Sequence, residues 1–204
     1  MRCGSDSKEK LLRTMIELIW ESSYGSASVD DICNHAGVKK GSFYHFYPSK
    51  ADLAAAAMEH HWQEREPEMD QIFSSQVSPW ERLSRLAKGL LETQREKQRT
   101  CGKVLGCPFF TIGVEMSTQE EKLRLQTERM NQRYLRYYES AIREGIALGE
   151  MAPGDPVTKA RQAYAYVMGL LLQAKVLNET SPLELIEPGL HSLLGVRLPF
   201  AQAA

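Results

Sequence analysis

Residues 29–48 read VDDICNHAGVKKGSFYHFYP and decide the fold of the first part of this 204-residue chain. A helix-turn-helix needs a small residue where its two helices nearly touch, and a glycine where the turn takes a positive φ. Cys33 and Gly37 meet these two needs. The apolar residues at the offsets that pack the helices together are Ile32, Ala36, Val38, Phe43 and Phe46. The stretch therefore predicts two short helices joined by a turn at Gly37.

The chain on both sides of this stretch has a helical pattern nearly throughout. No segment alternates apolar and polar residues for long enough to indicate a strand. A first helix is expected over about residues 7–23, and Ser28 with Asp31 forms a capping box for the second. The third helix is expected over residues 39–46, and Ser49 can cap a fourth that follows directly.

The rest of the chain contains longer helices with clear start signals. In three places a capping side chain precedes a proline, which is favoured at the first helical position. These places are Ser78-Pro79, Asp155-Pro156 and Ser181-Pro182. A long helix is expected over residues 118–148 and the last helix over Pro182–Leu194. The sequence predicts an all-α chain that divides near residue 48, with a helix from about residue 50 joining the two parts.

Charge is concentrated on one short element of a nearly neutral chain. The formal net charge is −1, which excludes a broadly basic coat protein for nucleic acid. Between Lys39 and Lys50, however, there are three lysines and no acidic residue. Lysines that contact phosphates give salt-dependent affinity, and contacts to base edges give sequence choice. Together with the helix pair this pattern favours DNA binding over a generic helix pair with a solvated surface.

Composition excludes several other classes of protein. The longest nearly unbroken apolar run, residues 163–172, is ten residues long, whereas a membrane-spanning helix needs about 20. The N-terminus is polar, so we expect a cytoplasmic protein that does not contact a membrane. Its cysteines are then expected to be reduced thiols. They are Cys3, Cys33, Cys101 and Cys107. Their spacing does not predict a zinc site, and we expect no metal and no cofactor.

The segment AGVKKGSFYHFYPSKADL resembles the hallmark segment of TetR-family transcriptional regulators, and YGSASVDDIC before it resembles that family's second-helix entry. The specific match covers roughly residues 10–55. The resemblance implies a three-helix helix-turn-helix DNA-binding domain, here residues 1–48. It also implies a helical ligand-binding and dimerisation domain, here residues 49–204, in a protein that binds palindromic double-stranded DNA as a homodimer.

The resemblance also implies which residues face DNA. Carried over by position they are Ser28, Lys39, Lys40, Ser42, Tyr44, His45 and Lys50. Tyr44 and Lys50 would mainly hold phosphate, whereas Lys40 and His45 would touch bases. Phe46 stands where the family often has His or Tyr, and Ser23 where it often has Gly, with Gly25 two residues later. The end of the first helix is therefore expected to be shifted.

The helix after Pro156 contains AYAYVMGLLLQA and is apolar on every side, so it must be covered all round. A partner subunit could cover one side, together with the last helix; the alternative is that this helix is the central core of a monomer. The predicted dimer residues are Tyr166, Gly169, Leu170, Leu190, Leu193 and Leu194. A twofold dimer would also place two recognition helices one DNA turn apart.

Aromatic residues are numerous in the second part and can line an apolar pocket. The family implies such a pocket between the fourth helix and the helices that follow, although each aromatic could equally be a core residue. The predicted residues of a small-molecule site are Trp62, Phe109, Phe110, Tyr134, Tyr138 and Tyr164.

Cys107 precedes Pro108, where a helix can begin, and a helix N-terminus stabilises a thiolate. Lys175 would add to this effect if it lies near. One hypothesis is that an oxidant or electrophile modifies Cys107 and thereby releases DNA. The alternative is that Cys107 is a small buried apolar residue.

Three classes of function therefore remain in view. The first is a ligand-responsive transcriptional repressor, with thiol sensing through Cys107 as its variant. The second is an enzyme, but the chain contains no GxSxG, P-loop, GxGxxG or HExxH motif and we expect no enzymatic activity. The third is a helical adaptor that binds only protein. Substituting the lysines of the third helix discriminates between a transcriptional repressor and a helical adaptor, because only the repressor needs them for DNA binding.

Overall fold

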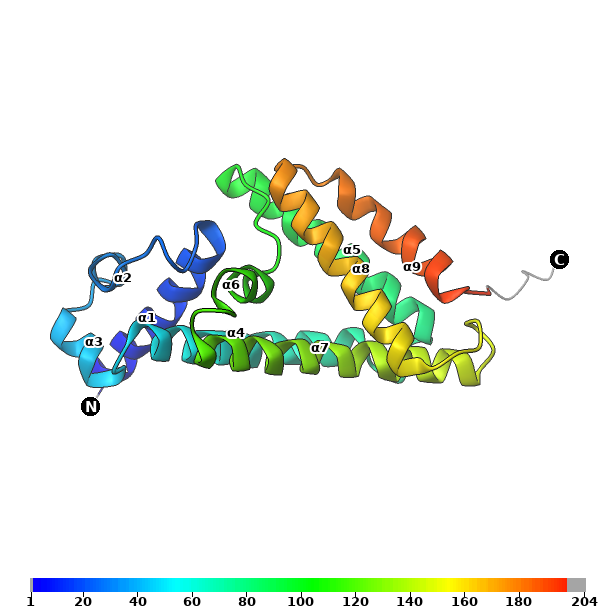
Figure 1. The fold of residues 1–204 in the computed structure, drawn as a ribbon, viewed down its shortest axis with the longest axis horizontal. Coiled ribbons are helices and arrows are strands. Elements are labelled where there is room, and N and C mark those ends of the chain that lie inside the picture. The colour runs from blue at the N-terminus through cyan, green and yellow to red at the C-terminus, as the bar shows by residue number, and fades with distance from the viewer. Residues whose placement is uncertain (1, 198–204) are drawn as a thin grey trace. The chain divides into compact units, whose positions relative to one another are not determined.

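A computed structural model describes the backbone of residues 2–197 and the side chains of residues 6–197, so Cys3 lies outside the described side chains. Every regular element in this part of the chain is a helix, which confirms the all-α expectation (Figure 1). The elements are α1 (Arg2–Glu21), α2 (Val29–Ala36), α3 (Lys40–Phe46), α4 (Lys50–Ile72), α5 (Pro79–Cys101), α6 (Pro108–Met116), α7 (Glu121–Ala147), α8 (Pro156–Leu177), the 3₁₀ helix η1 (Ser181–Leu185) and α9 (Ile186–Leu194).

The predicted start signals of α4, α5 and α8 are confirmed. Ser49 Oγ accepts a hydrogen bond from the Asp52 N–H at 3.1 Å. Ser78 caps α5, and Asp155 caps α8 by accepting a hydrogen bond from the Thr158 N–H at 2.8 Å. Each side chain satisfies one of the N–H groups that a helix start leaves without an internal partner.

The predicted start of the last helix is wrong. Ser181 does not cap an α-helix; its hydroxyl donates to the Glu179 carboxylate at 3.2 Å instead. Residues 181–185 form the short 3₁₀ helix η1 after Thr180, and the α-helix begins only at Ile186. The signal of a serine before a proline was present, but Ser181 is the first residue of η1, whose N-cap is Thr180, and does not precede an α-helix.

The described chain divides into two compact units, and the division differs from the expected boundary near residue 48. Unit 1 runs to Pro67 and also contains Cys107–Asn131; unit 2 contains Glu68–Gly106 and the chain from Gln132 onward. The dividing points therefore lie inside α4, between α5 and α6, and inside α7. Helix α6 groups with α1–α3 because it packs against α1 (Figure 1).

Unit 1 has its own apolar core. Leu11, Met15 and Ile19 of α1 are buried together with Ile32 of α2 and Phe43 of α3. Since three short helices bury little surface alone, the first halves of α4 and α7 and all of α6 complete this core. Hydrogen bonds tie the two long helices together here, from Lys122 to Asp52 and from Gln126 to Glu59.

Unit 2 has a second core, made by α5, α8, η1 and α9, and Figure 1 shows α8 and α9 side by side. Leu83, Val167 and Leu190 are fully buried there. Arg82, only 2% exposed, donates to the Val77 carbonyl and to both carboxylate oxygens of Glu144. A buried guanidinium is tolerated because these acceptors satisfy it.

Among residues 2–197, no helix combines the length and apolar character needed to cross a bilayer.

Candidate DNA-binding surface and effector groove

The helix-turn-helix forms where the sequence predicted it. Ser28 Oγ accepts from the Asp31 N–H at 3.1 Å, and the Asp31 carboxylate accepts from the Ser28 N–H at 2.9 Å. The Ser28 hydroxyl also donates to the Asp31 carboxylate, at 2.5 Å, and this hydrogen bond, together with the one from the Ser28 N–H, lowers the pKa of Asp31. Gly37 takes φ 63°, a left-handed conformation that favours glycine, and ends α2. Cys33 is buried beside the turn, where burial raises the pKa of its thiol.

The side chains predicted to read DNA lie mainly on the exposed face of α3 and at its start. Lys39, Lys40, Tyr44 and His45 are exposed, and Ser42 is half-buried. Tyr44 is 52% exposed although its ring packs edge-on against the buried Phe43 ring, with 5.1 Å between the centroids. Burial of Phe43 and exposure of its neighbours therefore give α3 one face for the core and one free face.

Lys40 does not stand alone on this surface. Its Nζ lies 2.8 Å from Oδ1 of Asp30 in α2, and this carboxylate raises the pKa of Lys40. Both side chains are more than half exposed, so the pair contributes little stability. A phosphate could therefore replace Asp30 as the partner of Lys40 at small cost.

Lys50, predicted to hold phosphate, is engaged inside the unit. Its Nζ donates to the carbonyls of Tyr24 and Ala27 at 3.0 and 2.9 Å, and it lies 4.0 Å from the centre of the Tyr24 ring. Partial burial lowers the pKa of Lys50. The phosphate contact stays a prediction, but in this structure the ammonium group fixes the loop between α1 and α2 (residues 22–28).

The sequence reasoning missed a second charged residue that contacts this loop. Glu115 of α6 accepts hydrogen bonds from the Tyr24 N–H at 3.0 Å and the Gly25 N–H at 2.6 Å. A separation of 90 residues leaves no local signal for this contact. In the structure, a Cβ on Gly25 would lie 2.8 Å from Oε1 of Glu115, so the glycine leaves room for this carboxylate.

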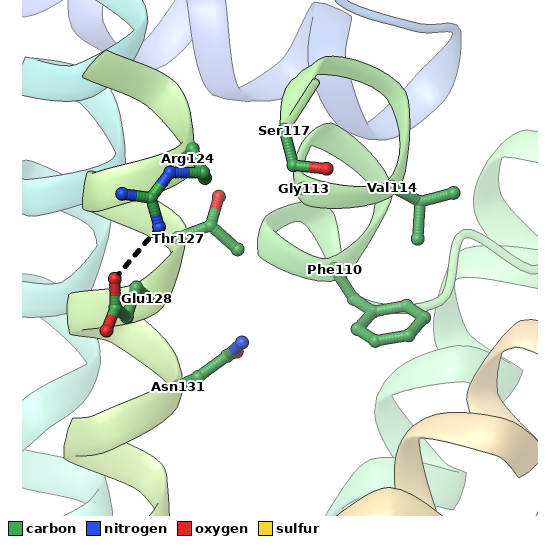
Figure 2. Close-up of a pocket in the computed structure, with 8 residues that line it drawn as sticks. All are labelled: Phe110, Gly113, Val114, Ser117, Arg124, Thr127, Glu128 and Asn131. Carbon is green, nitrogen blue, oxygen red and sulfur yellow. Dashed lines mark hydrogen bonds and ion pairs between the residues drawn. The ribbon is translucent and has the colours of Figure 1, made fainter. Parts of the chain in front are cut away.

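A groove opens between α6 and α7 within unit 1 (Figure 2). Its volume is about 330 Å³. Phe110, Gly113, Val114 and Ser117 line it from α6 and the residues that follow; Arg124, Thr127, Glu128 and Asn131 line it from α7. Of the residues predicted for a ligand site, Phe110 is the one that lies here.

The groove combines an apolar side with polar but charge-compensated groups. Arg124 pairs with Glu121 and with Glu128, so these carboxylates compensate the positive charge of its guanidinium at the groove. Thr127 is only 8% exposed, and its hydroxyl has no hydrogen-bond partner among the described residues. Figure 2 shows Thr127 between the two helices, opposite Gly113. Such a lining suits an uncharged molecule with hydrogen-bonding groups.

Comparison with known proteins identifies the family. The family model described as bacterial regulatory proteins of the tetR family matches residues 11–57, and that of the Tetracyclin repressor-like C-terminal domain matches residues 79–189. This chain belongs to the TetR family. It is therefore a DNA-binding transcriptional regulator.

Individual relatives agree with this membership. The transcriptional regulator AcuR of Cereibacter sphaeroides is 31% identical over 182 residues, which are 88% of this chain and 81% of AcuR. The repressor NemR of Escherichia coli is 25% identical over 183 residues, 88% of this chain and 89% of NemR. NemR in its reduced form superposes with a TM-score of 0.80, covering 94% of this chain and all of NemR at 22% identity. A TetR regulatory protein from Rhodobacter sphaeroides superposes with a TM-score of 0.80 at 27% identity, covering 91% of this chain and 97% of that one.

The other predicted ligand residues of this TetR-family chain fall into two separate groups. In unit 1, Trp62 and Phe109 are buried; the Trp62 indole donates to Glu66 at 3.1 Å. In unit 2, the Tyr164 ring stacks on Tyr134 and meets Tyr138 edge-on, with centroids 6.3 and 5.8 Å apart. The role of these aromatics in ligand binding stays a prediction.

The segment before Cys107 is held by side chains of unit 2. The buried Gln94 accepts from the N–H groups of Leu105 and Gly106, each at 2.9 Å, and donates to the Gly106 carbonyl. A Cβ on Gly106 would lie 3.5 Å from Cβ of Lys175, so the Lys175 stem runs along the residue before the thiol. Cys107 itself is partly exposed, at the N-cap of α6.

The predicted dimer residues do not share one exposed face. Leu190 and Leu194 have no exposed surface in the protomer and Leu170 is only 8% exposed, so their part in a dimer interface stays a prediction that this packing does not favour. Gly169 and Leu193 are exposed and Tyr166 is half-buried. The sequence pattern could not separate an internal face from an outer one on helices that are apolar on all sides.

Proposed function

We propose that this TetR-family protein is a cytoplasmic repressor that binds a palindromic operator as a homodimer and is released by a small molecule. The exposed, basic outer face of α3, a helix that contains no acidic residue, carries the DNA part of the proposal. Lys39, Lys40, Tyr44 and His45 stand on it, on a helix whose other face is fixed by Phe43. Such a face can enter the major groove, where base edges are distinguishable.

A second copy of the chain is the occupant we propose for the exposed apolar side chains of α8 and α9. Leu172, Val176 and Leu177 of α8 are exposed, as is Leu193 of α9. Exposed apolar clusters of this kind mark protein–protein interfaces. Gly169, one helical turn before Leu172, has open space around it and would let a partner helix approach.

The groove between α6 and α7 is our candidate for the effector site. The Thr127 hydroxyl is almost completely covered, so a ligand gains this partner only if α6 moves away from α7. Binding would therefore favour a state in which α6 is displaced. A ligand shifts an equilibrium only by its differential affinity for two states, and an otherwise unpartnered hydroxyl supplies such a difference.

The test begins with selection of duplexes from a random library by the purified protein. The proposal predicts an inverted repeat, and sedimentation of the complex should show two protomers per duplex. Recovery of no specific sequence would contradict it. A compound found to release this duplex should lose about tenfold in potency in Thr127→Val, which removes the hydroxyl and keeps the shape. Equal potency would remove the groove from the proposal.

A second candidate is thiol sensing through Cys107. The thiol is partly exposed, stands at the start of α6 and follows a segment along which Lys175 runs. The likeness to NemR, whose structure is described as a reduced form, favours this candidate. N-ethylmaleimide should release the selected duplex from the wild type but not from Cys107→Ser, with Cys101→Ser as the control for an exposed cysteine. Equal release from wild type and Cys107→Ser would end the idea.

A further inference from the structure

The loop between α1 and α2 is held between two opposite charges that come from different helices. Lys50 of α4 donates to its carbonyls at Tyr24 and Ala27. Glu115 of α6 accepts from its N–H groups at Tyr24 and Gly25. The loop precedes the capping box of α2, so its position sets where the helix-turn-helix begins.

The Glu115 contact is built for these two N–H groups. Each carboxylate oxygen takes one of them, Oε2 that of Tyr24 and Oε1 that of Gly25. Hydrogen bonds from backbone N–H groups to a carboxylate are stronger than those between neutral groups. They also satisfy two backbone donors that lie between helices and make no hydrogen bond to a carbonyl of the described backbone.

Gly25 completes the arrangement by leaving room. A Cβ at this position would lie 2.8 Å from Oε1 of Glu115, so the end of the Glu115 side chain would have to move away from the loop N–H groups. Gly25 does not have a positive φ, so its lack of a side chain provides room for this carboxylate and not a special backbone conformation.

Helix α6 has a different contact on another of its faces. A Cβ on Gly113 would lie 2.6 Å from Cγ2 of Thr127, so α6 also lies very close to α7 at the groove. Glu115, which holds the loop, is two positions after Gly113, which makes this close contact with α7. A displacement of α6 that opened the groove would therefore act on the loop through Glu115.

We infer that Glu115, with the space provided by Gly25, is a positioning residue for DNA binding. It fixes the helix-turn-helix on α6 and thereby sets the spacing at which two protomers meet their half-sites. This inference rests on the proposed binding of a palindrome by a homodimer. It assigns to Glu115 no contact with DNA or ligand.

The experiment measures affinity for three duplexes: the one that the wild type selects, and versions with one base pair added or removed between the half-sites. Glu115→Gln and Gly25→Ala should each weaken binding to the selected duplex roughly tenfold and should flatten the preference for its spacing. The double variant should be no weaker than either single one, because both changes break the same contact. Glu120→Gln is the matched control, since Glu120 raises the pKa of Tyr24 through its charge but has no hydrogen bond to the loop among the described side chains.

The spacing preference separates positioning from general destabilisation, which would weaken all three duplexes equally. Amide exchange gives an independent measurement: the Tyr24 or Gly25 N–H should exchange several-fold faster in Glu115→Gln. Wild-type affinity and spacing preference in both variants would overturn the inference, as would losses that multiply in the double variant. Failure of the wild type itself to prefer one spacing would instead overturn the proposed dimeric function.

Discussion

Gly113→Ala tests the close approach of α6 to α7 on which the effector groove depends. In an exposed helix interior, replacing glycine by alanine stabilises by about 1 kcal/mol. Here the new Cβ would lie 2.6 Å from Cγ2 of Thr127, and overpacking of this kind costs about 1 to 3 kcal/mol. The substitution should therefore leave the free energy of unfolding unchanged or lower it by up to about 2 kcal/mol.

Thr127→Ser removes the methyl group that the new Cβ would meet. By itself it should cost about 0.8 kcal/mol of apolar burial. In that background Gly113→Ala should become stabilising by about 1 kcal/mol, which gives a coupling between the two sites of about 1 to 3 kcal/mol. Gly89→Ala in α5 is the matched control, because a Cβ there meets no atom within 4 Å and should simply stabilise.

The assay is urea unfolding of the wild type, the two single variants, the double variant and the Gly89→Ala control at one protein concentration, since association alters apparent stability. Each kcal/mol also corresponds to about 2 to 4 °C in Tm for a chain of this size. If Gly113→Ala stabilises equally in both backgrounds, as Gly89→Ala does, α6 and α7 are not in contact and the groove is not held in the form described.

Three further predictions concern stability, the thiol and pH. Arg82→Ala should lower the free energy of unfolding by about 2 kcal/mol in urea because the buried guanidinium loses its hydrogen bonds to Val77 and Glu144 and leaves a gap, whereas Arg85→Ala, in an exposed pair, should cost under about 1 kcal/mol. Gln94→Leu should speed alkylation of Cys107, measured by mass spectrometry, because the segment before the thiol loses three hydrogen bonds; an unchanged rate would show that the segment is held otherwise. The pKa of Asp31 is lowered in the folded chain. Its ionised carboxylate therefore contributes fully to the free energy of unfolding above the unfolded pKa near 4, and this contribution is lost as the pH falls below that value. Asp31→Asn should reduce this loss of stability when unfolding is measured from about pH 6 to about pH 3.

Local sequence rules predicted the local structure of the helix-turn-helix. The capping box of Ser28 and Asp31, the left-handed Gly37 and the cap at Ser49 all depend on residues within a few positions of one another. The same type of rule was wrong at Ser181, which is the first residue of the 3₁₀ helix η1 and does not cap the α-helix that begins at Ile186.

Contacts between distant segments could not be predicted in this way. Glu115 meets a loop 90 residues earlier, and nothing in either segment indicates the other. Leu190 was placed at an interface because its helix is apolar, yet that side chain is buried inside the protomer. The phosphate contact of Lys50, expected by resemblance, stays a prediction, but nothing in the sequence indicated that its ammonium group binds carbonyls of residues 24 and 27. Periodicity shows that a residue is apolar or charged, but the partner depends on the tertiary fold.

The claim that most needs a direct test is that the outer face of α3 binds DNA. The measurement is the affinity of Lys39→Ala with Lys40→Ala for the duplex that the wild type selects, together with sedimentation to confirm the same oligomeric state. The control is Lys88→Ala with Lys97→Ala in α5, which removes the same charge from unit 2. We predict a loss of about 100-fold or more for the α3 variant and less than about threefold for the control. Equal affinities of the two variants would contradict the assignment of α3 as the DNA-reading helix.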